Sequence, residues 1–165
     1  MAQTIHLTLS IDGTQVKGES SQVQEGKEGT IEVFSFESSV TTPTDPGSGK
    51  ATGRREFHPV KIKKRIDAST PLIAEAMVQG TPCTCRFDFY RPSATPGVAD
   101  ELFYHIELVR ATVAGLSQYL PDVMSAHSQE TRDAYEVVEF TFDQITWFTE
   151  LPSGKGCTDS WSGKK

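Results

Sequence analysis

The stretch CTCRFDFYR, residues 83–91, alternates between apolar and polar side chains from its first cysteine to its second phenylalanine. Successive side chains of a β-strand point to opposite faces of the sheet, so this period of two predicts a strand. Its four apolar residues then share one face, which we expect to lie in a hydrophobic core: Cys83, Cys85, Phe87 and Phe89.

Two longer segments downstream show the same alternation, and each is interrupted once. Leu102–Leu108 alternates until the pattern slips at Val109, and Tyr135–Phe148 alternates until it slips before Ile145. A slip of one residue is typical of a β-bulge, and long bulged strands curve. The predicted fold class is therefore mainly β, a compact antiparallel β-barrel of two packed sheets. The inward side chains of the second segment are expected to be Val138, Phe140 and Phe142.

The first half of the chain contributes further predicted strands. Ile5–Ile11 alternates and meets Asp12-Gly13, a dipeptide suited to the positive φ angles of a tight hairpin turn. Ile31–Val40 has apolar side chains on both faces, which predicts that both faces are covered. Val60 and Ile62 alternate with lysines in another strand.

One short flanking α-helix is predicted among these strands. Thr70 can cap it, Pro71 suits its first position, and Gly80 ends it. A helix this short is marginal alone, since isolated helices below ~12 residues are unstable in water, so it must pack on a sheet. Its apolar stripe is expected to consist of Leu72, Ile73, Ala76 and Met77.

The chain has 165 residues, the length of one domain, which we expect to span residues 1–151. Residues 152–165 are polar and are expected to form a flexible C-terminal tail. Residues 41–55 contain no large hydrophobe and several prolines and glycines. We expect them to form an extended loop, and loops of this length in compact domains usually have a function.

The formal net charge of -6 argues against nucleic acid as a partner, because such binding needs basic surface. The basic residues nevertheless cluster in one stretch, so the subunit is expected to have faces of opposite sign. Such an asymmetry suits head-to-tail self-association. The clustered residues are Lys50, Arg54, Arg55, Lys61, Lys63, Lys64 and Arg65.

The sequence shows neither a membrane-spanning segment nor the pattern of a secretory signal. No apolar run approaches the ~20 residues that cross a bilayer, so we expect no membrane insertion. The first residues lack the positive start and apolar stretch of a secretory signal. We expect a cytoplasmic protein that, if exported, leaves by a route needing no signal peptide. The odd count of three cysteines fits a reducing compartment.

Motifs for catalysis or cofactor binding are incomplete. Residues 47–52, GSGKAT, are similar to a phosphate-binding loop but lack its glycine at position 44 and its Ser or Thr at position 51. Cys83 and Cys85 have the spacing of core residues on a strand, not of a zinc knuckle. We therefore predict no enzyme, no cofactor and no metal site. The histidines lack metal-binding spacing and are expected at the surface: His6, His58, His105 and His127.

A further set of motifs occurs in a characteristic order. GKATGR at residues 49–54 precedes Phe57, Lys63-Lys64 and IDASTPL at residues 66–72. Flanking pieces lie at residues 11–20, 31–36 and 136–145. Together these motifs, over roughly residues 3 to 150, resemble the Hcp family, the tube proteins of type VI secretion systems.

The resemblance implies a β-barrel subunit that forms homo-hexameric rings, which stack into a tube. A contractile sheath expels the tube with its spike, and effector proteins ride in the lumen or on the tip. Glu37-Ser38-Ser39 stands where the family often has Ser-Trp-Gly, so six copies of Glu37 are expected to make the lumen acidic. The resemblance also places the extended loop against an adjacent subunit or ring, through Gly47, Ser48, Gly49, Lys50, Ala51, Thr52, Gly53 and Arg54.

Two other classes of function compete with a tube subunit. A small-ligand-binding β-barrel module predicts a monomer with a sizeable apolar cavity. An enzyme predicts a cleft with strongly shifted titrating groups, of which the sequence gives no sign.

Overall fold

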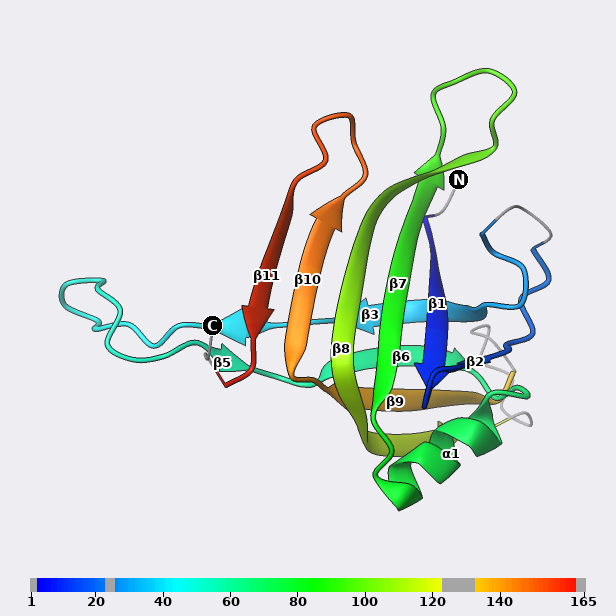
Figure 1. The fold of residues 1–165 in the computed structure, drawn as a ribbon, viewed down its shortest axis with the longest axis horizontal. Helices are drawn as coiled ribbons and strands as arrows, with labels where there is room; N and C mark the ends of the chain where they lie inside the picture. The colour runs from blue at the N-terminus through cyan, green and yellow to red at the C-terminus, as the bar shows by residue number, and fades with distance from the viewer. Residues whose placement is uncertain (1–2, 23–25, 123–132, 163–165) are drawn as a thin grey trace.

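The computed structural model describes residues 3–22, 26–122 and 133–162 (Figure 1). These residues form eleven strands and one helix, so the predicted mainly β class is confirmed. In chain order the elements are β1 (Thr4–Ile11), β2 (Thr14–Val16), β3 (Ile31–Glu37), β4 (Val40–Thr41), β5 (Glu56–Phe57), β6 (Val60–Arg65), α1 (Thr70–Gln79), β7 (Cys83–Pro92), β8 (Asp100–Tyr119), β9 (Tyr135–Thr141), β10 (Gln144–Thr149) and β11 (Gly156–Ser160).

The long strand β8 closes the barrel by belonging to two sheets. Its first half pairs with β7 and β10, and its second half pairs with β9. The six strands β8, β7, β1, β3, β6 and β9 thereby form a closed circuit. Figure 1 shows β1, β7, β8, β10 and β11 running steeply, with β3, β6 and β9 crossing them. The predicted barrel of two packed sheets is confirmed.

The bend in β8 lies at Arg110, whose φ of 50° is in the left-handed region. The register with β7 shifts across this residue, between Leu108 and Ala111, and the register with β9 shifts just after it, between Val113 and Gly115. A bulge re-aims the following side chains and increases strand curvature. The predicted slip at Val109 therefore marks the place where the strand changes sheet.

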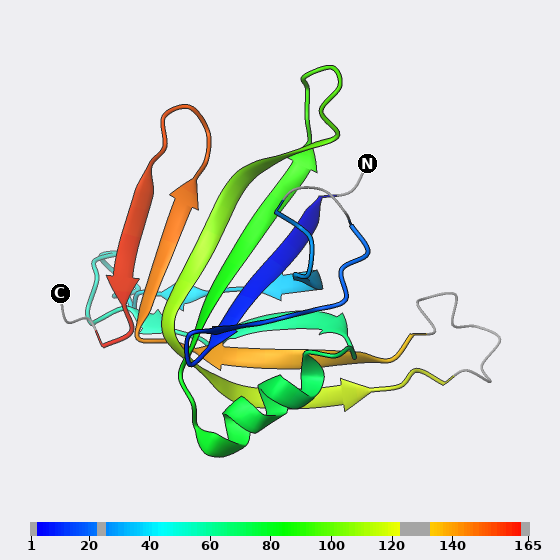
Figure 2. The same cartoon turned by 45° about the vertical axis from the view of Figure 1, so that its right-hand side comes forward.

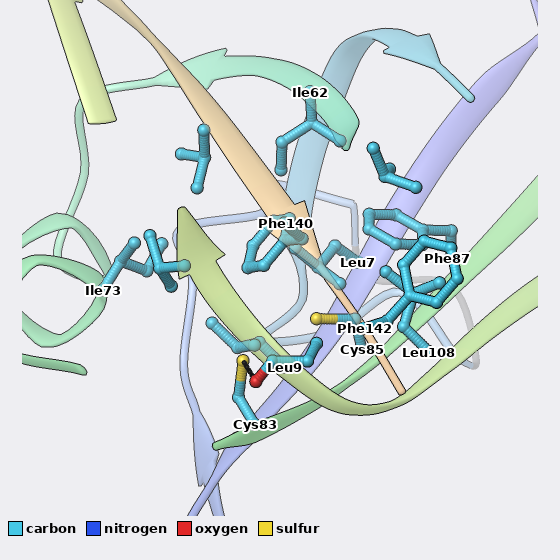
Figure 3. Close-up of a cluster of buried hydrophobic side chains, with 14 of the residues drawn as sticks. Leu7, Leu9, Ile62, Ile73, Cys83, Cys85, Phe87, Leu108, Phe140 and Phe142 are labelled. Carbon is cyan, nitrogen blue, oxygen red and sulfur yellow. Dashed lines mark hydrogen bonds between the residues drawn. The ribbon is translucent and has the colours of Figure 1, made fainter. Parts of the chain in front are cut away.

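Alternating side chains from both sheets fill the space between them (Figure 3). Cys83, Cys85 and Phe87 are buried as predicted, and Phe140 from β9 packs 6.4 Å from Phe87, ring centre to ring centre. The Cys83 thiol donates a hydrogen bond to the Ala111 carbonyl at 3.3 Å. Burial raises the pKa of the Cys85 thiol. Both cysteines are buried and act as small hydrophobic core residues.

The helix α1 packs along the second half of β8 (Figure 2). It ends at Gly80 in the left-handed conformation, as predicted. Its start differs from prediction: Ser69 is the N-cap, and its hydroxyl donates to Asp67 and makes no side-chain cap bond. Thr70, the predicted cap, is the first helical residue, and its hydroxyl donates to Glu136 at 2.9 Å. Leu72, predicted to belong to the buried apolar stripe, is 43 % exposed, so that part of the prediction is wrong.

Two predicted strands are divided differently in the structure. The segment 135–148, predicted as one strand, forms two strands, β9 and β10, with Asp143 in the turn between them. The strand at Ile31 ends at Glu37, after a bulge that brings Phe36 to the core and leaves Phe34 47 % exposed. The prediction that both faces of this strand are covered is therefore wrong within a single chain.

Part of the segment expected to form a flexible tail, residues 156–161, is paired or packed against the barrel in the structure. β11 pairs in register with β10, from Gln144 opposite Ser160 to Phe148 opposite Gly156. Trp161 then packs against the core, 4.9 Å from Phe142 between ring centres. Paired backbone exists as far as residue 160, beyond the expected domain boundary at 151.

Candidate functional site

Residues 40–57 form an arm that extends away from the barrel (Figure 1). β4 and β5 pair at its base, and Thr44 bridges Ala51 further along. Residues 47–54, predicted as an extended loop, are exposed along their whole length. The arm is therefore a hairpin joining two strands, which is not the strand-to-helix setting of a phosphate-binding loop.

Hydrogen bonds within the arm give its tip a defined conformation. The Asp45 carboxylate accepts from the Ser48 backbone N–H and hydroxyl, each at 2.7 Å, and these bonds lower the pKa of Asp45. The backbone N–H of Gly49 donates to the Asp45 carbonyl at 2.8 Å, and that of Thr52 donates to Pro43 at 2.9 Å. These internal bonds hold the exposed tip in one conformation, so it has little conformational freedom left to lose.

The base of the arm is anchored to the barrel and to β11. The Arg55 guanidinium donates to the Asp159 carboxylate at 2.6 Å. Phe57 is buried and stacks on Trp161 at 5.8 Å between ring centres. The arm thus projects from a fixed point on the body.

The second sheet is formed by β3, β6, β9 and the second half of β8, and its outward face carries the other predicted site residue. Glu37 is exposed on β3, directly opposite Lys61 on β6, which in turn lies opposite Glu139 on β9. Lys61 also forms a 3.6 Å ion pair with Glu139. The side chain of Glu37 therefore has a cation beside it, a feature that the sequence did not reveal.

Comparison with known proteins then decides the family. The family model described as "Type VI secretion system effector, Hcp" matches residues 8–148, well over half of the chain. The chain belongs to the Hcp family. The "Major exported protein" of Pseudomonas aeruginosa is 34 % identical over 142 residues, covering 84 % of this chain and 78 % of that protein.

Solved Hcp structures have the same fold. A variant of Hcp1 from E. coli EAEC 042 is 26 % identical, with a TM-score of 0.81, over 97 % of this chain and 99 % of that one. The secreted protein Hcp3 from Pseudomonas aeruginosa is 24 % identical, with a TM-score of 0.75, and covers the same shares. The second likeness supports the fold alone.

The predicted basic face of this Hcp chain is only partly at the surface. Lys61 and Arg65 point outward, whereas Lys64 is fully buried. The alternation of β6 places Lys64 on the same inward side as Val60 and Ile62. Its ammonium group donates to Glu136 at 2.6 Å, so the expectation of a surface lysine at position 64 is wrong.

The predicted surface location of the histidines holds for His58 and is wrong for His6 and His105, which are buried. His127 lies outside the described residues. Lys27 and Thr30, from the segment before β3, cover His6. Burial, together with the charge of Lys27, lowers the pKa of His6 to about 4.

His105 stacks on Phe148 at 5.1 Å between ring centres, and its Nδ1 lies 2.6 Å from Glu150. Among the residues described, no group of three His, Cys, Asp or Glu side chains could hold a metal ion. In the same part of the chain, no helix has the length and apolar character needed to span a membrane.

A surface groove of about 970 Å³ lies where β8 bends. Its lining includes Arg110, Asp143, Asp159 and Trp161, from the bend, the β9–β10 turn and the end of β11. Arg110 and Asp143 pair across it at 3.0 Å, and both side chains are largely exposed. The groove is a corner between sheets, and its carboxylates are paired: Asp143 with Arg110, and Asp159 with Arg55 at the base of the arm.

Proposed function

We propose that this chain is a structural subunit of the type VI secretion tube. It assembles as homo-hexameric rings, and stacked rings form the tube that sheath and spike proteins expel with its effectors. Membership of the Hcp family over residues 8–148 is the observation that carries the proposal. In this role the chain is not an enzyme. It is exported from the cytoplasm through type VI secretion.

The arm supplies one contact of the proposed assembly. Gly47–Arg54 is exposed yet hydrogen-bonded internally, so docking it costs little conformational entropy. Among the described residues, Lys50 and Arg54 make no ion pair within the chain, so their charges are available to a neighbour. Head-to-tail rings and stacks need pairs of different surfaces on each subunit that complement one another, and a projecting arm suits such a contact.

Glu37 is proposed to face the lumen and to bias which effectors are retained. Because Lys61 lies opposite Glu37, each subunit would place one positive and one negative charge at this level of the lumen. The lumen would therefore not be purely acidic there. Cargo affinity should therefore change in a Glu37→Gln tube, and unchanged affinity would contradict the assignment.

Size-exclusion chromatography with light scattering tests the assembly. A tube subunit should elute as a particle of about six times 18.1 kDa. The small-ligand module predicts a lone chain, and it is disfavoured because fully buried side chains such as Phe87, Phe140 and Leu108 fill the barrel. A mass of one chain at high concentration would overturn the proposal.

A further inference from the structure

Three cations lie in one row on the outward face of the second sheet. Lys61, Lys63 and Arg65 alternate along β6 with inward-pointing residues. Residues two apart on a strand are roughly 7 Å from one another, so the row has the repeat of an extended chain.

Aromatic rings lie along the same face. Tyr135 on β9 stacks on Tyr119 on β8, with ring centres 5.2 Å apart and planes 21° apart. The Lys63 ammonium sits 4.0 Å from the centre of the Tyr135 ring, and the Arg65 guanidinium sits 5.3 Å from that of Phe34. We call these six residues the cation face: Phe34, Lys61, Lys63, Arg65, Tyr119 and Tyr135.

The cations of this face are weakly neutralised by their own chain. Among the described residues, Lys63 has no carboxylate partner. Lys61 meets Glu139 at 3.6 Å, and Arg65 meets Asp133 at 3.4 Å, in pairs that are largely exposed. Such exposed pairs contribute little to stability, at most about 1 kcal/mol.

Elsewhere the chain forms much shorter ion pairs. Arg91 meets Glu101 at 2.7 Å, and the buried Lys27 meets Asp100 at the same distance. On the cation face, aromatic rings contact Lys63 and Arg65, and the carboxylates near Lys61 and Arg65 lie no closer than 3.4 Å. A ring orients a cation through its π-face but accepts few of its N–H donors, which therefore stay available to a ligand.

We propose that the cation face binds an extended, acidic polypeptide segment. Carboxylates at alternate positions of an extended peptide repeat at about 7 Å, which matches the row on β6. Charge-assisted hydrogen bonds from Lys63 and Arg65 would supply the attraction. This inference rests on the proposed function, in which Glu37 on the same sheet faces the lumen and the bound segment belongs to a carried protein.

The face fits a peptide better than a single-stranded nucleic acid, although stacked rings and cations can serve either. Glu37 and Glu139 share this surface with the cations, and the whole chain carries a net charge of -6. A nucleic acid carries a negative phosphate at every nucleotide, so some of its phosphates would lie against these carboxylates and be repelled. A peptide can place its acids opposite the cations alone.

Fluorescence anisotropy with a labelled octapeptide of alternating Glu and Ser tests the inference on the purified full chain. Lys63→Gln and Arg65→Gln should each weaken binding about fivefold, since each removes one charge contact. Tyr135→Leu should weaken it by a smaller factor. Lys17→Gln, an exposed lysine outside this face, is the matched control and should bind as the parent does.

Light scattering of each variant separates this inference from the proposed function. A parent chain that forms six-chain particles but does not bind the peptide would overturn the inference alone. If the protein is a single-chain particle and still binds the peptide, with the expected losses in the variants, peptide binding by the cation face would be supported and the proposed tube assembly would be overturned. Equal binding by Lys17→Gln and Arg65→Gln, or tighter binding of a single-stranded oligonucleotide than of the peptide, would also overturn it.

Discussion

The Lys64 ammonium lies 2.6 Å from the Glu136 carboxylate, and both side chains are fully buried between β6, β9 and the start of α1. Lys64 also donates to Asp67 at 2.9 Å and to the Arg65 carbonyl at 2.7 Å. Gln118 donates to the second oxygen of Glu136 at 3.2 Å. The network joins the helix to the barrel from the inside.

Glu136→Gln should destabilise the fold by about 3–5 kcal/mol, because it leaves the Lys64 charge buried without its main partner. Replacing both partners with apolar residues, in Lys64→Met with Glu136→Leu, should recover much of that loss. Urea unfolding measures both changes. Glu139→Gln removes an exposed pair and should cost less than ~1 kcal/mol. Equal losses at Glu136 and Glu139 would contradict the burial argument.

His6 makes stability depend on pH. Its pKa is about 4 in the fold and returns to 6.5 on unfolding, so the unfolded chain binds the extra proton between these values. The contribution of neutral His6 is present above pH 6.5 and is lost as the pH falls towards 4. Between pH 7.5 and 4.5 the loss should be about 2–3 kcal/mol, since one pKa unit corresponds to ~1.4 kcal/mol.

Urea unfolding of His6→Gln and of the parent at both pH values measures this contribution. The variant should lose the pH-dependent part that belongs to His6, whereas His58→Gln, which changes an exposed histidine, should keep the parent's slope. An identical slope in parent and His6→Gln would rule out this source of acid sensitivity.

Most of the fold could be predicted from the local periodicity of apolar residues. The two-residue alternation at Cys83–Phe87 and at Val138–Phe142 correctly predicted buried core residues. The slip at Val109 correctly predicted an irregularity where β8 bends. These features depend on neighbours in sequence, so they are readable without a structure. The buried Lys64 also follows the inward alternation of Val60 and Ile62, and that pattern was a usable signal of its position.

Long-range contacts account for what the sequence did not predict. His6 lies on the polar side of β1, which is covered by Thr30 and its segment and by Tyr90 from β7. The strand β11 has no apolar alternation, and its pairing is set by the edge that β10 offers. The row of rings and cations on β3, β6, β9 and β8 likewise joins residues far apart in the chain. These long-range contacts cannot be predicted from a local sequence pattern.

The C-terminal strand should contribute to stability through Trp161. This side chain stacks on Phe57 and meets Phe142 edge-on at 4.9 Å. Trp161→Ala should cost about 2 kcal/mol, less than for a fully buried tryptophan because the site is partly exposed. Cys157→Ser, at an exposed position of the same strand, should change stability by less than ~0.5 kcal/mol. Thermal unfolding compares them, and an unaffected Trp161→Ala would indicate a dispensable tail.

Arg54 tests whether the arm joins subunits. Its charge is exposed and the arm is held by its own hydrogen bonds, so Arg54→Glu should leave the fold and its unfolding temperature unchanged. Reversing the charge at a contact should raise the concentration at which six-chain particles dissociate, by about tenfold or more. Lys17→Glu makes the same charge change at an exposed site away from the arm and should assemble like the parent. Light scattering across a dilution series measures both variants. If Arg54→Glu assembles as well as Lys17→Glu, contact between Arg54 and a neighbouring subunit is excluded.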